Sequence, residues 1–186
     1  MKAYLKSQIA MVSVLILLLT YIFPTTASAV EDKPIKTEKI APFRKILIKG
    51  NIEVILIQRP DVGISYADDN EGNARVTQQG EILSITGTST VLGKIIVYVN
   101  ELYRIEADEN AMVKTQGILS VKFLQIILKG NAIADIYTTS QELYTAIYDK
   151  SELYLRGNTD KHFLFMDKNP KLTFDQFAAL RTQATE

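Results

Sequence analysis

Two nearly identical segments constrain the fold of this chain more than any other feature of its sequence. Leu128 to Ile136 reads LKGNAIADI, and Ile48 to Leu56 reads IKGNIEVIL. In each segment two apolar runs meet at a Gly-Asn pair, and both residue types accept a positive φ angle at low cost. A motif that recurs in this way is typical of a structural unit. The sequence therefore predicts paired strands joined by a tight bend.

The chain from Phe43 to residue 166 has a residue pattern typical of strands throughout. Around the first copy of the motif, Ile46, Ile48 and Val54 alternate with polar residues. A period of two is the pattern of half-buried β-strands. No window in this part of the chain has a convincing helical period. The sequence therefore predicts an all-β body.

Weaker copies of the bend lie around Asn110, Ser151 and Asn169, on both sides of the Gly130-Asn131 bend. The steps between the turn residues Asn110, Asn131, Lys150 and Asn169 are nearly equal. A repeat period of about 20 residues marks stacked architectures in which each unit buries its apolar face against its neighbours. We therefore expect a parallel β-helix or solenoid-like stack over residues 42–170.

A β-sandwich is the alternative fold, because short strands with closely spaced turn signals are also typical of sandwiches. Residue type at equivalent positions favours the β-helix. Ala111, Ala132 and Ser151 occupy the same place after the bend, where stacked backbones leave little room. Two positions later, Val113, Ala134 and Leu153 follow on one face.

The segment 171–186 predicts a short helix. Phe174, Phe177, Ala178 and Leu180 approximate the i, i+3, i+4 spacing of a helix with one apolar face. An amphipathic terminal helix would cap the open end of a solenoid, which otherwise exposes apolar side chains and unpaired strand groups.

Residues 1–29 predict a secretory signal peptide. Lys2 and Lys6 precede an apolar run from Ile9 to Phe23, and Ala27-Ser28-Ala29 forms an A-x-A cleavage signal. The alternative is an uncleaved membrane anchor, but the run is short for a spanning helix. Residues 30–41 are polar and contain Pro34, so they predict a flexible leader.

Composition excludes several function classes. The chain has 21 Lys and Arg against 21 Asp and Glu, so bulk charge gives no reason to expect a nucleic-acid partner. It has no cysteine, which removes disulfides, thiolate chemistry and cysteine-based lipid anchors. After Ala29 no stretch is long and apolar enough to span a bilayer as a helix.

Four segments together resemble a known family, the head GIN domain of putative auto-transporter adhesins, which is common in Bacteroidetes. They are FRKILIKGNIEVILIQ, ISYADDN, GEILSITG and LKGNAIADI, and the resemblance covers residues 42 to 168. It implies an exported protein with a right-handed β-helix-like fold and supplies no catalytic residues. Asp149-Lys150-Ser151 and Lys168-Asn169-Pro170 depart from the glycine and serine that the family favours at its bends.

Three features could carry chemistry. Because His162 is the single histidine, we expect it to have an ordinary structural role and not to belong to a catalytic triad or a His-based metal site. The Asp68 to Asn73 loop is rich in oxygen ligands and is a weak candidate for Ca²⁺, although it lacks the order of an EF-hand. Asp108 and Glu109 lie at a bend, where adjacent carboxylates point apart. We therefore expect no catalytic residue and no cofactor.

Aromatic and basic residues in the repeats suggest a ligand-binding face. Tyrosine rings on a flat β surface can stack against sugars or contact proteins, although rings that pack between neighbouring coils would give the same pattern. The predicted face consists of Tyr137, Tyr148, Tyr154, Lys114, Lys129 and Arg156.

The sequence thus predicts an exported, non-enzymatic domain of the cell envelope, periplasmic, surface-bound or secreted. It would act as an adhesion or interaction module for a surface glycan or an envelope protein. One alternative is a periplasmic carbohydrate-active enzyme, a lyase or hydrolase on a β-helix. Another is a structural envelope protein without a small ligand. The sequence leaves the oligomeric state open.

Overall fold

The structure, a computed structural model, describes residues 37–66 and 73–185. The described residues are all-β and contain no helix. The strands are β1 (Thr37–Lys39), β2 (Lys45–Lys49), β3 (Ile52–Gln58), β4 (Gly63–Tyr66), β5 (Ala74–Gln79), β6 (Ile82–Gly87), β7 (Gly93–Val99), β8 (Arg104–Asp108), β9 (Met112–Thr115), β10 (Leu119–Leu128), β11 (Ile133–Asp149), β12 (Glu152–Lys168) and β13 (Lys171–Thr185).

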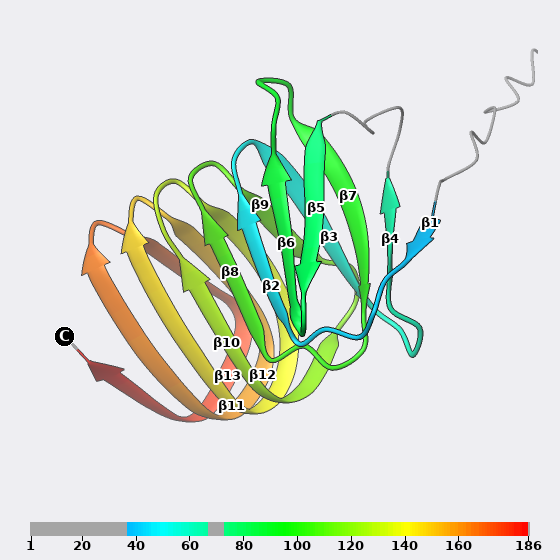
Figure 1. The fold of residues 1–186 in the computed structure, drawn as a ribbon. Helices are drawn as coiled ribbons and strands as arrows, with labels where there is room; N and C mark the ends of the chain where they lie inside the picture. The colour runs from blue at the N-terminus through cyan, green and yellow to red at the C-terminus, as the bar shows by residue number, and fades with distance from the viewer. Residues whose placement is uncertain (1–36, 67–72, 186) are drawn as a thin grey trace, which may run out of the picture. The chain divides into compact units, whose positions relative to one another are not determined.

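All these strands belong to one sheet of 13 strands, which curls around the core (Figure 1). Its order is β1-β4-β7-β3-β9-β11-β10-β8-β2-β6-β5, and β12 and β13 extend it from β11. Most ladders are parallel, and the antiparallel pairs are β1–β4, β4–β7 and β5–β6. A single, mostly parallel sheet differs from the two packed antiparallel sheets of a β-sandwich.

The long strands bend, so each contributes to two sides of the molecule (Figure 1). We call one side flank A, made of β7, β3, β9 and residues 133–137 and 152–156. Flank B is made of β6, β2, β8 and residues 125–128, 144–148 and 163–167. Tight bends join the flanks on one side. On the other, the chain turns a corner in β10, β11 and β12.

The ladder offsets confirm the predicted steps of the repeat. Gln125 pairs with Arg104 across 21 residues, which is also the separation of the bonded side chains of Asn131 and Asn110. Ile133 pairs with Glu152 and Glu152 with Lys171, each across 19 residues. Equivalent residues of successive repeats therefore lie side by side in the sheet.

Small residues line the inner side of the bends, as predicted. Ala111, Ala132 and Ser151 are fully buried. Val113, Ala134 and Leu153, two positions further on, are buried too. The core that the sheet encloses consists of alternate strand residues, among them Ile46, Ile48, Val54, Leu56, Ile85, Val97, Ile105, Ile126, Leu128, Ile136 and Leu155.

The bends keep one backbone geometry even where glycine is absent. Gly50 and Gly130 have φ angles of 80° and 65°. The equivalent residues of three other bends are Glu109, Asp149 and Lys168, with φ angles of 63°, 59° and 70°. Side-chain and backbone contacts between neighbouring bends offset the small cost of this conformation. The repeat therefore continues through the bends whose sequences depart from glycine and serine.

The predicted C-terminal helix is wrong, because residues 171–185 form the strand β13 along β12. The register shifts between Leu155 and Gly157, whose partners are Phe174 and Phe177, and Gln176 has a φ angle of 54°. A bulge inserts one extra residue, so aromatic residues three apart in sequence lie on the same face of a strand. The i, i+3 spacing came from this bulge and not from helical turns.

The flexible leader predicted over residues 30–41 includes part of the sheet. Residues 37–39 form β1, which pairs antiparallel with β4. Backbone hydrogen bonds to a neighbouring strand order this segment although its side chains are polar, which sequence periodicity does not reveal. The predicted signal peptide lies outside the described residues.

Candidate functional site

The structure divides the predicted binding face between the two flanks. Lys114, Tyr137, Tyr154 and Arg156 lie on flank A, where the ladders place Tyr137 opposite Arg156 and both Lys114 and Tyr154 opposite Asp135.

Tyr148 lies on flank B, and Lys129 directly follows the flank B residues of β10. The Lys129 Nζ is 5.9 Å from the centre of the Tyr148 ring, and this ring is 5.3 Å from that of Phe165. The six residues predicted to form one binding face therefore form two separate groups.

Ion pairs connect most of the polar side chains on flank A. The Lys114 Nζ lies 2.8 Å from Glu53 and the Arg156 guanidinium 2.7 Å from Asp135. Glu152 accepts hydrogen bonds from the Tyr154 hydroxyl and the Lys171 ammonium, which together lower the pKa of its carboxyl group. A ligand would have to compete with these partners, so flank A is a poor place for a polar ligand.

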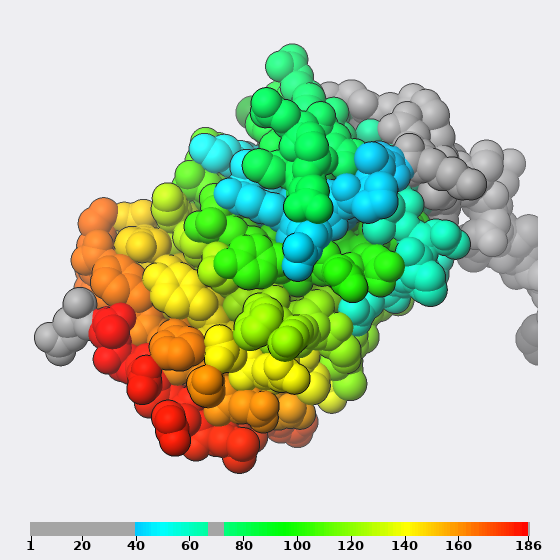
Figure 2. Space-filling view, turned by 60° about the horizontal axis from the view of Figure 1, so that its bottom comes forward, coloured from blue at the N-terminus to red at the C-terminus, as the bar shows by residue number. Residues whose placement is uncertain are grey.

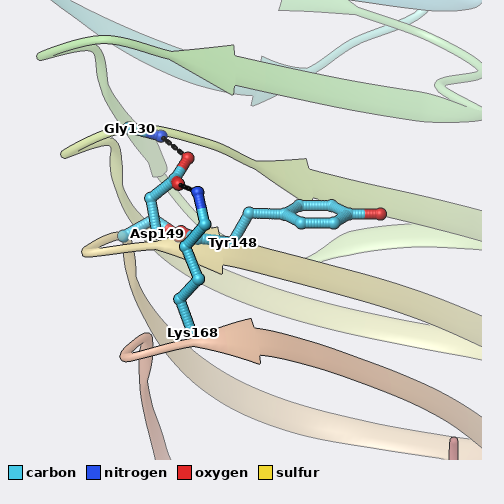
Figure 3. Close-up of polar contacts among 5 residues, drawn as sticks. Gly130, Tyr148, Asp149 and Lys168 are labelled. Atoms are coloured by element: carbon cyan, nitrogen blue, oxygen red, sulfur yellow. Dashed lines mark hydrogen bonds and ion pairs between the residues drawn. The ribbon is translucent and has the colours of Figure 1, made fainter. Parts of the chain in front are cut away.

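A second network holds neighbouring bends together (Figure 3). One carboxylate oxygen of Asp149 accepts a hydrogen bond from the Gly130 N–H at 3.0 Å, and the other bonds the Lys168 ammonium. The hydrogen bond from Lys168, followed by that from Gly130, lowers the pKa of the Asp149 carboxyl group. Asp149 therefore acts as a structural anion between three successive bends.

Aromatic side chains gather at another place, where flank B meets the corner. Tyr103, Phe123 and Tyr144 are 39%, 41% and 36% exposed. With the half-buried Phe163 they line a hollow of about 380 Å³, which we call the aromatic groove. Its remaining lining residues are Leu124, Gln125 and Glu142. This face is seen in Figure 2, where chain segments coloured green to orange lie side by side.

The repeat positions two of these rings. Gln125, Tyr144 and Phe163 are ladder partners on three successive strands, so their side chains point to the same side. The Gln125 amide donates a hydrogen bond to the Tyr103 hydroxyl at 2.7 Å, which fixes the third ring beside them. The Glu142 carboxylate pairs with the Lys161 ammonium at 2.8 Å. The groove therefore presents aromatic rings beside an amide and a neutralised carboxylate.

The aromatic groove continues into an adjoining hollow of about 480 Å³ that shares Tyr103 and Phe123. Polar groups on its floor are held in place: the Gln58 amide donates to the carbonyls of Asn100 and Ser120, each at 2.9 Å, and accepts from the Ser120 N–H at 2.8 Å. A third hollow of about 760 Å³ shares Asn100 with the second. The three hollows therefore adjoin one another.

The prediction from the sequence missed this surface, although the spacing of two of its aromatic residues could be read from the sequence. Tyr144 and Phe163 are one repeat step apart, so their alignment was readable from the sequence. Tyr103 directly precedes β8, and Phe123 lies in β10 after the corner, where its ladder partner is Glu142 on β11. Only the folded chain shows that they join the other rings.

His162 is a core residue and not a surface ligand. It is buried, and one ring nitrogen lies 2.9 Å from the Thr145 hydroxyl. The rings of Phe174 and Phe177 contact it edge to face, with centroids 5.9 Å and 5.5 Å away. Burial lowers the pKa of this imidazole from 6.5 to about 4. The structural role preferred from the sequence is thus the one that its surroundings support.

The other candidates give no site among the described residues. Asp108 accepts a hydrogen bond from the Glu109 N–H at 2.7 Å and pairs with Lys49 at 3.6 Å, so it stabilises its own bend. The described residues contain no group of three or more histidine, aspartate or glutamate side chains placed to hold a metal ion. Most of the predicted Asp68 to Asn73 calcium loop lies outside them.

The part of the chain that the structure describes has no helix long and apolar enough to cross a membrane.

Solved structures with the same fold come from species of Bacteroides and Parabacteroides. A "putative adhesin" from Bacteroides fragilis is 19% identical, with a TM-score of 0.70 over 81% of this chain and 74% of that chain. A "putative adhesin" from Parabacteroides merdae is 14% identical, with a TM-score of 0.61 over 81% and 76%. A "Putative lipid binding protein" from Parabacteroides distasonis is 13% identical, with a TM-score of 0.58 over 81% and 77%. At these identities the likeness establishes the fold.

No curated protein matches this chain. Residues 42–185, which include nearly the whole sheet, match the sequence family described as "Putative auto-transporter adhesin, head GIN domain". This match extends beyond the resemblance seen in the sequence, since it includes the terminal strand β13. The chain therefore belongs to this head GIN domain family.

Proposed function

We propose that this domain is an exported, non-enzymatic interaction module of the cell envelope that binds a surface glycan along the aromatic groove. The observation that carries the proposal is the set of three aromatic side chains, each more than a third exposed, in one hollow. Exposed aromatic rings offer flat apolar faces, which suit the apolar faces of sugar rings. The Gln125 amide beside them can both donate to and accept from hydroxyl groups.

The shape of the surface supports a chain-like ligand. The aromatic groove and the adjoining hollow share Tyr103 and Phe123, and backbone hydrogen bonds fix the Gln58 amide in the second hollow. A rigid, preformed surface loses little conformational entropy when a ligand binds. An oligosaccharide of several units matches such a row of hollows better than a single sugar does.

The hydrogen bonds and ion pairs made by the carboxylates support binding without catalysis. A general acid in glycoside hydrolysis needs a raised pKa. The pKa of the Asp149 and Glu152 carboxyl groups is lowered instead, chiefly by hydrogen bonds from Lys168 and Tyr154. Glu142, the carboxylate in the aromatic groove, is paired with Lys161.

We also infer that the domain is a right-handed β-helix of stacked coils. The supporting observations are the parallel ladders and their offsets of 19 and 21 residues. Connections between parallel strands of one sheet are nearly always right-handed. Solution scattering on the protein would test whether its dimensions fit a closed stack of coils.

Export makes a direct prediction about the N-terminus. If residues 1–29 are a signal peptide, the protein recovered from producing cells begins at Val30. N-terminal sequencing or intact mass spectrometry of the protein measures this. A protein that retains Met1 in a membrane fraction would instead indicate an uncleaved anchor.

Binding at the aromatic groove is tested with a glycan array, followed by calorimetric titration of each hit. Tyr144→Ala and Phe123→Ala are each expected to weaken binding about tenfold or more, because aromatic anchors at interfaces commonly contribute about 1–2 kcal/mol or more. Tyr154→Ala on flank A is the matched control and should leave the affinity unchanged. Melting temperatures of all three variants exclude unfolding as the cause.

Three outcomes would contradict the proposal. Loss of binding in Tyr154→Ala but not in Tyr144→Ala would move the site to the face predicted from the sequence. Release of shorter oligosaccharides from a bound glycan would make the domain an enzyme. Binding to envelope proteins without any glycan hit would make the ligand a protein.

A further inference from the structure

The sheet ends very differently at its two extremes. At one extreme it ends in short strands, β1 with three residues and β5 with six. At the other, β13 has 15 residues and pairs only with β12 among the described residues. A long, open edge strand presents a row of unpaired backbone N–H and C=O groups, which proteins normally shorten or cover.

Apolar side chains accompany this open edge. Phe174 is 49% exposed, Met166 is 38% exposed, and Leu180 is 86% exposed. Phe174 stacks on Phe177 with the ring centroids 5.3 Å apart. Since Phe174 pairs with the buried Leu155, it points to the inner side of the sheet. Within the part of the chain that the structure describes, the core is therefore open to solvent at β13, and another strand laid against this edge would continue it.

The sequence of β13 is complementary to itself when read in the opposite direction. In an antiparallel pair of two β13 strands centred on Ala178, Asp175 of each copy lies opposite Arg181 of the other. Both side chains are exposed, and Arg181 is the ladder partner of the exposed Lys161. No salt bridge within the described residues involves Asp175 or Arg181. In the dimer each Asp175 would therefore lie opposite an Arg181 of the other copy, which gives two pairs of opposite charge.

The two irregular positions of β13 also lie symmetrically about Ala178. Its ladder with β12 is interrupted at the bulge around Gln176 and again at Leu180, which has no ladder partner. In the antiparallel pair these two positions face each other. Phe174 then lies opposite Thr182 and Phe177 opposite Ala179; the β12 partners of Phe174, Ala179 and Thr182 are buried. Inner residues stay opposite inner residues on both sides of the axis.

From these observations we propose that the domain forms a symmetric dimer in which the β13 strands of two copies pair antiparallel about Ala178. A two-fold axis perpendicular to the sheet reverses the strand direction but keeps the inner face of the sheet on the same side. The two curled sheets therefore join into one, and the two open core ends cover each other. The aromatic groove lies on other strands, so the dimer would carry two grooves.

Charge reversal tests this register. Asp175→Arg places two arginines from one copy opposite two from the other, and Arg181→Asp does the same with aspartates. Each single variant is expected to dimerise on the order of a hundredfold more weakly, because two attractive pairs become repulsive. The double variant, Asp175→Arg with Arg181→Asp, restores both pairs and should dimerise like the original protein. Sedimentation velocity over a range of protein concentrations measures the dimer fraction.

A mixture of the two single variants is the sharpest arm of the experiment. In a heterodimer, a copy with arginine at both positions faces a copy with aspartate at both, so all pairs are complementary. The mixture should therefore dimerise although neither variant does so alone, and misfolded variants could not give this result. A protein that stays monomeric at about 100 µM overturns the proposal. So do single variants that still dimerise, and a mixture that remains monomeric.

Discussion

Replacing Gly157 with alanine is expected to destabilise the domain by about 3–5 kcal/mol, a large share of the roughly 5–15 kcal/mol that is typical of a folded domain. Gly157 has a φ angle of 103°, which side-chain-bearing residues rarely adopt. A Cβ atom there would lie 2.0 Å from the carbonyl oxygen of Thr138 on the adjacent strand. Backbone cannot move aside as a flexible side chain does, so β11 and β12 would have to separate.

Gly117→Ala provides the matched control for this substitution. Gly117 has a similar φ angle of 88°, but nothing lies within 4 Å of the position that a Cβ atom would take. Backbone strain alone should therefore cost about 1–2 kcal/mol. Urea unfolding followed by circular dichroism gives both values. Equal losses in the two variants would show that the close approach to Thr138 has no energetic effect.

Acidification from pH 6.5 to pH 4 is expected to cost the folded domain up to about 3 kcal/mol through His162 alone, at about 1.36 kcal/mol for each pH unit of the pKa shift. Burial lowers the pKa of this histidine from 6.5 to about 4. Between these values the unfolded chain takes up a proton that the folded chain does not. The stabilisation is therefore complete above pH 6.5, falls with the pH, and is fully lost below about pH 4.

The variant His162→Gln isolates this effect. Glutamine stays neutral at every pH, and its amide can replace the contact of the imidazole with Thr145. The carboxyl groups of Asp149 and Glu152, whose pKa is lowered, also lose stabilising interactions in acid, but in both proteins and mainly below pH 4.5. The unfolding free energy of the variant should therefore change less between pH 6.5 and 5. Parallel curves for the two proteins would contradict the role of His162.

Much of the architecture was predictable because it depends on local patterns. Alternating apolar residues gave the strands, and the Gly-Asn pairs gave the positions of the bends. From β8 onward the repeat steps proved to be ladder offsets, because these strands pair with their copies one repeat away. The small residues Ala111, Ala132 and Ser151 marked the crowded inner side of the bends for the same reason.

The predicted terminal helix shows where such patterns are ambiguous. Phe174 and Phe177 are three positions apart, which suits one face of a helix. A bulge at Gln176 gives the same spacing to one face of a strand. The pairing with β12 selects the strand, and no property of residues 171–185 alone contains that information.

The binding surface was the least predictable feature. The tyrosines chosen from the sequence lie on two flanks, and ion pairs hold the charged residues chosen with them on flank A. The aromatic groove combines Tyr103, which precedes β8, and Phe123, which follows the corner in β10, with the rings of Tyr144 and Phe163, which are one repeat step apart. Membership of a surface depends on where the chain turns its corner, which periodicity does not specify.

By itself, the sequence determined the all-β character, the spacing of the repeat and the family resemblance, because each of these is written in residues close together or equally spaced. The tertiary structure alone decided that β13 is a strand, that His162 is a buried neutral ring, and that four aromatic side chains share one groove. The physical reason is that backbone pairing, burial and surface shape arise between residues of neighbouring strands. These residues become neighbours only when the strands pair and the sheet curls.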